Sequence, residues 1–180
     1  LPFQAGADRI LAAMNRKHTG AEYIALIDRI RAVRPDIALS TDVIVGFPGE
    51  TDAEFEDTLR MIDRVRFAQA YSFKYSARPG TPAANLEQLP EAIKIARLSR
   101  LQDVISGHQT TFNTAHVGKV MPVLFDRRGR RPGQLIGRSP YLQSVHAQLD
   151  SAWLGKILEV EIAAAGPNSL AGVVHAISAA

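Results

Sequence analysis

The sequence predicts an α/β region over residues 1–115, followed by a small all-β barrel over residues 116–180. In the first region, segments with apolar residues at helical spacing alternate with short β-branched runs, a pattern typical of βα units and a parallel sheet. After Gly118 the pattern changes to five short strand-like runs separated by turn residues, which favours a small barrel. This change marks the predicted domain boundary.

Three helices are predicted in the first part of the chain, and two of them share a start signal. Apolar residues at helical spacing predict a short helix over 8–15. Thr19 and Thr51 each precede a glutamate by three residues, the capping-box pattern in which both side chains satisfy free backbone N–H groups at the helix start. Apolar stripes extend the two helices to about residues 34 and 65.

Two segments have strand character, and the chain also opens on one. Residues 37–47 are β-branched and almost continuously apolar, as expected for a strand buried on both faces. Residues 68–76 predict a second strand, and residues 1–4 resemble the end of a buried strand. Because no initiator methionine precedes them, we expect the chain to be a fragment of a longer protein. A loop over 77–90 and a long helix over 90–113 follow.

The barrel domain carries the excess positive charge of the chain. Its predicted strands cover residues 119–125, 133–138, 142–148, 155–163 and 170–177. Residues 116–180 hold 7 Lys or Arg against 4 Asp or Glu, whereas residues 1–115 hold 14 of each class. A neutral domain followed by a basic one indicates a polyanionic partner for the second.

The composition excludes several kinds of site. Without cysteine, the chain forms no disulfide, thiolate zinc site, cysteine nucleophile or cysteine-bound iron–sulfur cluster. Its five histidines form no pair with metal-ligand spacing on one helix face, so no metal site is predicted. No apolar run approaches the ~20 residues that span a membrane, and no signal peptide is apparent, so we expect a cytoplasmic protein.

Three sequence blocks in fixed order carry a family resemblance. They are LPFQAGADRILAAMNRKHT (1–19), STDVIVGFPGETDAEF (40–55) and FKYSARPGTPAA (73–84). Together they resemble the methylthiotransferase family of radical-SAM enzymes, and the β region resembles the TRAM domain that ends those proteins. The resemblance implies an incomplete radical-SAM (βα) barrel, entered at the end of its fourth strand, followed by an OB-like TRAM barrel.

The resemblance also implies an activity for the full-length protein. In the branch that this chain resembles, the enzyme inserts a methylthio group at carbon 2 of isopentenyladenosine beside the tRNA anticodon. Its cofactors are S-adenosylmethionine and two [4Fe-4S] clusters, and its partner is the anticodon stem-loop. The cluster cysteines would lie outside this chain, so we expect the chain alone to be inactive and assign it no catalytic residue. Two alternatives stay open: a noncatalytic RNA-binding protein, and a relative that modifies a ribosomal protein.

Cofactor contacts are implied at the ends of three strands. The implied residues are Gln4, Asp42, Val45, Gly46, Phe47 and Arg78. Gln4 would hydrogen-bond the ribose or another polar part of S-adenosylmethionine, the block around Gly46 would line the adenine, and Arg78 would meet a carboxylate or phosphate. The alternatives are a strand-end glutamine bonded to backbone, a turn that needs glycine for geometry alone, and a surface arginine. Ala5 and Ala7 replace serines that are usual in the family.

RNA contacts are predicted mainly in the β domain. Four arginines crowd one glycine-containing hairpin, which we call the basic hairpin: Arg127, Arg128, Arg130 and Arg131. Arg138 follows on the next strand, and Arg16 with Lys17 forms a second basic site in the first region. Clustered arginines match a surface that binds the phosphate backbone. The alternative is a charged loop that is only solvated.

Overall fold

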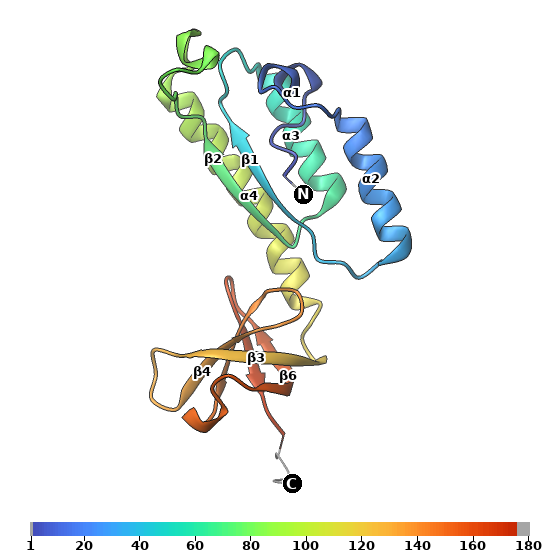
Figure 1. Ribbon diagram of the computed structural model, residues 1–180, viewed down its shortest axis with the longest axis vertical. Helices are drawn as coiled ribbons and strands as arrows, with labels where there is room; N and C mark the ends of the chain where they lie inside the picture. The colour runs from blue at the N-terminus through green and yellow to red at the C-terminus, as the bar shows by residue number, and fades with distance from the viewer. Residues whose placement is uncertain (1, 176–180) are drawn as a thin grey trace. The chain divides into compact units, whose positions relative to one another are not determined.

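The computed structural model describes residues 2–175, which form two compact units (Figure 1). The first unit ends at His108 and the second begins at Gln109. Within the described part of the chain, no helix combines the length and the apolar character that crossing a membrane requires.

A small parallel sheet forms the centre of the first unit. Strand β1 (Ser40–Val45) pairs with β2 (Gln69–Lys74), with Ser40 opposite Gln69 and Val45 opposite Lys74. Gln4 forms a parallel bridge to Val43 on β1, with its N–H donating to the Asp42 carbonyl (3.1 Å) and its carbonyl accepting from the Ile44 N–H (2.9 Å). The strand-end character predicted for the first residues is therefore confirmed at Gln4, whereas Leu1 lies outside the described residues.

Two helices of the first unit begin where the capping boxes predict. The helices are α1 (Asp8–Ala13), α2 (Gly20–Val33), α3 (Asp52–Val65), the 3-10 helix η1 (Pro82–Asn85) and α4 (Glu91–Thr114), of which α2 and α3 follow capping boxes and α4 continues into the second unit. Thr19 and Thr51 both accept a hydrogen bond from the backbone N–H three residues ahead, and the glutamate there bonds back to the threonine N–H at 2.8 Å in each case.

Only one face of the parallel sheet is covered by helices. Val43 and Val45 are fully buried and share a core with residues of α2, α3 and α4, among them Ile27, Ile62 and Leu101. The other face carries Tyr71 and Phe73, each 52% exposed. The expectation that residues 37–47 form a strand buried on both faces holds for one face of β1 only, since Asp42 and Ile44 on the second face are partly buried.

The second unit is a closed five-stranded barrel. Its strands are β3 (Val120–Arg128), β4 (Gln134–Arg138), β5 (Ser144–Gln148), β6 (Ile157–Ala165) and β7 (Leu170–Val173). They follow one another around the barrel in the order β3-β4-β5-β7-β6, with β5 and β7 parallel. This arrangement confirms the predicted barrel and is consistent with an OB-like fold. The final predicted strand extended to residue 177, and residues 176 and 177 lie outside the described part.

Candidate functional site

The carboxyl ends of the parallel strands meet at one edge of the first unit. There the Tyr75 N–H donates to the Val45 carbonyl (2.8 Å), next to the Gln4 bridge. Phe47 packs edge-on against Tyr75 at 5.0 Å, within a cluster that also holds the buried Ala5 and Ala7 of the first segment. Ligand sites in parallel α/β folds lie at such edges. The structure thus brings Gln4, Gly46 and Phe47 together.

The turn from β1 into α3 has a conformation that only glycine adopts readily. Gly46 and Gly49 have φ values of 73° and 76°, in the left-handed region. A Cβ atom on Gly46 would lie 2.5 Å from the Cγ atom of Lys94 on α4. The N–H of Gly46 donates to Oε2 of Glu50 at 2.8 Å, so the protein itself uses this amide. The turn geometry therefore requires glycine at position 46, and a role of its backbone at the cofactor stays a prediction.

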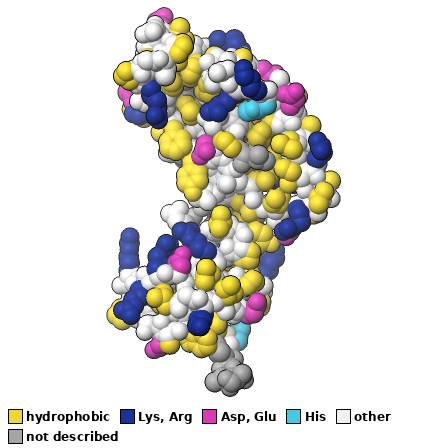
Figure 2. Space-filling view, in the orientation of Figure 1, with side chains coloured by type: hydrophobic (Ala, Val, Ile, Leu, Met, Phe, Trp, Pro, Cys, Tyr) yellow, Lys and Arg dark blue, Asp and Glu magenta, His cyan; other side chains and the backbone are white. Residues whose placement is uncertain are grey.

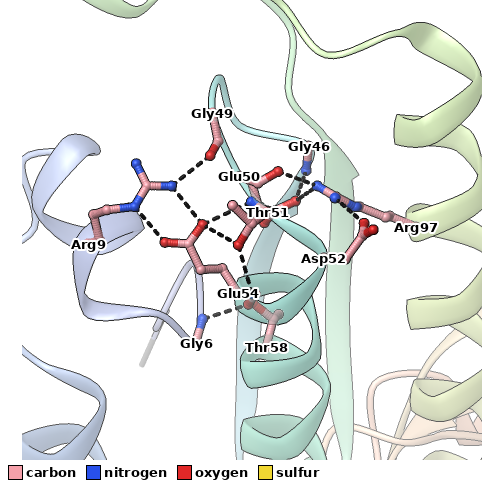
Figure 3. A network of polar contacts seen from close by, with 10 residues as sticks. All are labelled: Gly6, Arg9, Gly46, Gly49, Glu50, Thr51, Asp52, Glu54, Thr58 and Arg97. Carbon is pink, nitrogen blue, oxygen red and sulfur yellow. Dashed lines mark hydrogen bonds and ion pairs between the residues drawn. The ribbon is translucent and has the colours of Figure 1, made fainter.

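A buried ion pair fixes one flank of this turn (Figure 3). Glu50, with a fully buried side chain, accepts from Nη1 of Arg97 at 2.7 Å, and Nη2 of Arg97 reaches Asp52 at 2.6 Å. Burial raises the pKa of Glu50, while the Gly46 N–H and Arg97 oppose the rise. Oε1 of Glu50 and Nε of Arg97 are buried with no hydrogen-bond partner among the described residues. Removing either Glu50 or Arg97 would therefore leave an unpaired buried charge, which strongly destabilises the folded state.

A second, more exposed pair fixes the other flank. Arg9 of α1 contacts both carboxylate oxygens of Glu54 at 2.6 Å, and it donates to the Gly49 carbonyl at the same distance. The hydrogen bond from Arg9 is the main reason that the pKa of Glu54 falls to about 2. The Gly6 N–H adds a bond to the Thr58 hydroxyl at 2.9 Å. The turn is consequently held by α1 on one side and by α4 on the other.

The remaining residues predicted to bind the cofactor lie in differing surroundings. The Val45 side chain faces the helix-side core and is fully buried, so only its backbone reaches the strand edge. Asp42 is partly buried and lies opposite Tyr71 in the pairing of β1 with β2. Gln4 is 6% exposed with a φ of 72°. Arg78 is exposed in the loop that follows β2.

Sequence reasoning missed Arg97, which is central to this network. It stands four residues before Leu101 and eight before Ile105, both buried on α4. A cation in line with the buried positions of a helix was the available signal, because such a charge needs a partner. The partner could not be identified from the sequence, since Glu50 lies 47 positions away.

The basic hairpin connects β3 to β4 in the second unit. Its four arginines are exposed, and none makes a hydrogen bond or ion pair through its side chain with another described residue. In the first unit, by contrast, Arg60, Arg64 and Arg100 are paired with carboxylates, which leaves their charge locally neutralised. Figure 2 shows Lys and Arg side chains gathered on the β3–β4 side of the barrel. Among the described residues, no ion pair therefore neutralises the positive charge of the hairpin arginines.

The hairpin also borders a hollow of about 460 Å³. Its lining combines hairpin residues with the segment after β5, namely residues 128–135 and 149–151. The Gln134 side chain lies so close to Gly129 that a Cβ there would be 2.3 Å from Oε1 of Gln134. Arg138 lies on β4, exposed, with Nη1 donating to the Leu142 carbonyl at 3.2 Å. Arg16 and Lys17 are exposed just after α1 in the first unit.

Comparison with known proteins matches both units to established families. Residues 1–62 match the model of the radical SAM superfamily, and residues 115–175 match that of the TRAM domain. The chain is 61% identical over 173 residues to the tRNA-2-methylthio-N(6)-dimethylallyladenosine synthase of Novosphingobium aromaticivorans, and 58% and 57% identical to those of Maricaulis maris and Erythrobacter litoralis. Each match covers 96% of this chain, which spans only 38–39% of the length of these relatives.

Proposed function

We propose that this chain, which belongs to the radical-SAM methylthiotransferase family, is the part of a tRNA-modifying enzyme that shapes one side of the cofactor site and docks the RNA. The observation that carries this proposal is the 61% identity that extends over both the radical SAM and the TRAM segments. The complete enzyme would place a methylthio group on carbon 2 of dimethylallyl(isopentenyl)adenosine beside the anticodon, in the cytoplasm.

We assign residues 1–115 to the radical-SAM barrel and residues 116–180 to the TRAM-like RNA-binding domain. In this assignment the segment that ends at Gln4 is one strand of an incomplete barrel, and β1 and β2 are the next two strands. The uncovered face with Tyr71 and Phe73, each 52% exposed, supports it, because parallel sheets are normally covered on both faces. The remaining barrel strands of the complete enzyme would enclose this face.

The residues present do not fit an iron–sulfur cluster, because the chain has no cysteine. Both [4Fe-4S] clusters of the complete enzyme would be bound by the part of the relatives that this chain does not span. We therefore assign no step of the reaction to a cluster ligand here.

The strand edge does fit part of S-adenosylmethionine. Gln4, Asp42 and Arg78 offer polar groups, and the backbone of Val45 and Gly46 with the Phe47 ring offers a surface for a flat base. When bound, S-adenosylmethionine supplies the methyl group and, with the cluster, the radical needed at an unreactive C–H bond. The Gly46–Glu50 turn, held by Arg9 and Arg97, would position this surface.

The chain alone should bind S-adenosylmethionine weakly or not at all. In the family the amino and carboxylate groups of the methionine moiety bind the cluster iron, so only adenine and ribose contacts would remain here. Isothermal titration calorimetry of the chain with S-adenosylmethionine should give a Kd in the millimolar range or no measurable heat. Micromolar affinity would show that the site is complete without the cluster and would contradict the assigned roles.

The RNA partner is proposed to be the tRNA anticodon stem-loop, bound chiefly by the basic hairpin. Arg138, and more weakly Arg16 with Lys17, would add phosphate contacts. Arginines without protein partners favour phosphate binding, because pairing with RNA costs no existing ion pair.

The tRNA preference distinguishes this function from a merely basic surface. We expect the chain to retain tRNA in filter binding at about 100 mM salt several-fold better than duplex DNA of equal phosphate number. Phosphate contacts alone would bind both polymers equally, so a preference for tRNA reports contacts with groups that only the RNA offers. Equal affinity for both polymers would contradict a dedicated tRNA-binding role.

A further inference from the structure

The outer face of β4 and β5 carries three cross-strand pairs beside the basic hairpin. Leu135 and Val145 point into the barrel core, so the alternate residues of both strands point outward. The outward pairs, in order from the hairpin end, are Gln134 with Gln148, Ile136 with His146, and Arg138 with Ser144. We call this set the β4–β5 face. The pair of Ile136 and His146 therefore lies between two pairs of polar side chains.

A β-bulge extends the middle row onto β3. The register between β3 and β4 shifts between Phe125, which is buried, and Arg127. Arg127 consequently lies opposite Ile136, and residues directly opposite in an antiparallel pair share a face. On the other side, His146 lies opposite Ala171 of β7. Arg127 therefore joins the basic hairpin to the β4–β5 face, whereas Arg128 pairs with the inward-facing Leu135.

The chemistry of this face suits nucleobases rather than phosphates. The side chains of Gln134, His146 and Gln148 make no hydrogen bond with another described residue, so their polar atoms are open to a ligand. Glutamine amides supply both donors and acceptors for base edges, and an imidazole beside an aliphatic side chain supplies a surface for base stacking. OB-like barrels bind oligonucleotides on the second and third strands and on the loop between the first two. In this barrel those elements are β4, β5 and the basic hairpin.

We propose that the β4–β5 face binds unpaired bases of single-stranded RNA whose phosphates lie along the basic hairpin. Ile136 and His146 would contact the base faces, and Gln134 with Gln148 would contact the base edges. This inference rests on the proposed RNA-binding function and deepens it: the hairpin supplies salt-dependent affinity, and the adjacent face supplies contacts that depend on bases.

The test compares two single-stranded RNA probes of equal length, one normal and one with its bases removed. The double variant Ile136→Ala/His146→Ala should weaken binding of the normal probe about tenfold, because both side chains that would contact the base faces are lost. It should leave the affinity for the abasic probe and the salt slope unchanged. The matched control is Val120→Ala/His175→Ala, where Val120 is 60% exposed and lies at the far end of β3 from the hairpin.

Fluorescence anisotropy measures the affinity of both probes for the wild-type chain and the two variants. Unchanged affinity for the normal probe, an equal loss on both probes, or an equal loss in the control variant would each overturn the base-binding face. Such a result with the hairpin still required for binding would leave the proposed function intact. If the wild-type chain binds neither probe, both the proposed function and this inference are wrong. Matching melting curves by circular dichroism verify that the variants are folded.

Discussion

Replacing Arg97 with methionine should lower the free energy of unfolding of the first unit by about 3–5 kcal/mol, because it leaves a buried carboxylate without its counter-ion. Methionine retains much of the arginine volume, so the loss reports the charge rather than a cavity. Glu50 would keep only the Gly46 N–H as a hydrogen-bond donor. Urea denaturation at neutral pH, followed by circular dichroism, measures the change.

The stability loss of the Arg97→Met variant should depend on pH in a defined direction. Burial already raises the pKa of Glu50, and removing Arg97 should raise that pKa further. A carboxyl whose folded-state pKa is raised favours the folded state most below its unfolded pKa and loses that contribution as the pH rises. The deficit of the Arg97→Met variant should therefore shrink as the pH is lowered from 7 towards about 4.

The double variant Glu50→Gln/Arg97→Met is the matched control. It removes both charges while an amide oxygen can still accept from the Gly46 N–H, so it should be more stable than Arg97→Met alone. A single-variant loss below about 1 kcal/mol, or a double variant that is less stable than the single, would contradict the importance of this pair for the turn.

Replacing all four arginines of the basic hairpin with alanine should flatten the salt dependence of tRNA binding. Four lost phosphate contacts correspond to a decrease of roughly three to four units in the slope of log affinity against log salt concentration. The affinity at about 50 mM salt should fall by two orders of magnitude or more. Filter binding of an unmodified anticodon stem-loop between about 50 and 300 mM salt measures both quantities.

The control for this prediction is Arg16→Ala/Lys17→Ala. These residues are equally exposed but belong to the first unit, so we expect a much smaller change of slope. If the hairpin variant keeps its full slope while the Arg16/Lys17 variant loses it, the barrel is not the main RNA anchor. All six positions are exposed, so the fold should be retained in both variants.

Local signals in the sequence predicted most of the fold. The capping boxes at Thr19 and Thr51 placed two helix starts correctly, because capping depends on residues only three apart. Turn residues between short strand-like runs likewise predicted the barrel strands, since such residues mark where strands end. The charge pattern also identified the four arginines of the basic hairpin, which are exposed, and their role in RNA binding stays a prediction.

Features that depend on distant contacts were not predictable in the same way. The Glu50–Arg97 pair requires α4 to pack against the β1–α3 turn, which no local pattern reveals. The bulge that places Arg127 opposite the outward-facing Ile136 depends on the register with β4. The open side of the parallel sheet was also missed, because an apolar run has the same composition whether its second face is covered by this chain or by another segment.

One measurement tests the central proposal most directly. The matching segment of the Novosphingobium aromaticivorans synthase is replaced by this chain, and the chimera is produced in a bacterial strain that lacks its own synthase. Mass spectrometry of the nucleosides from its tRNA then quantifies the 2-methylthio form of N6-dimethylallyladenosine. We predict that the chimera forms this nucleoside, and that the four hairpin substitutions strongly reduce it. A folded chimera with intact clusters that leaves the tRNA at the unthiolated dimethylallyladenosine would contradict the proposed function.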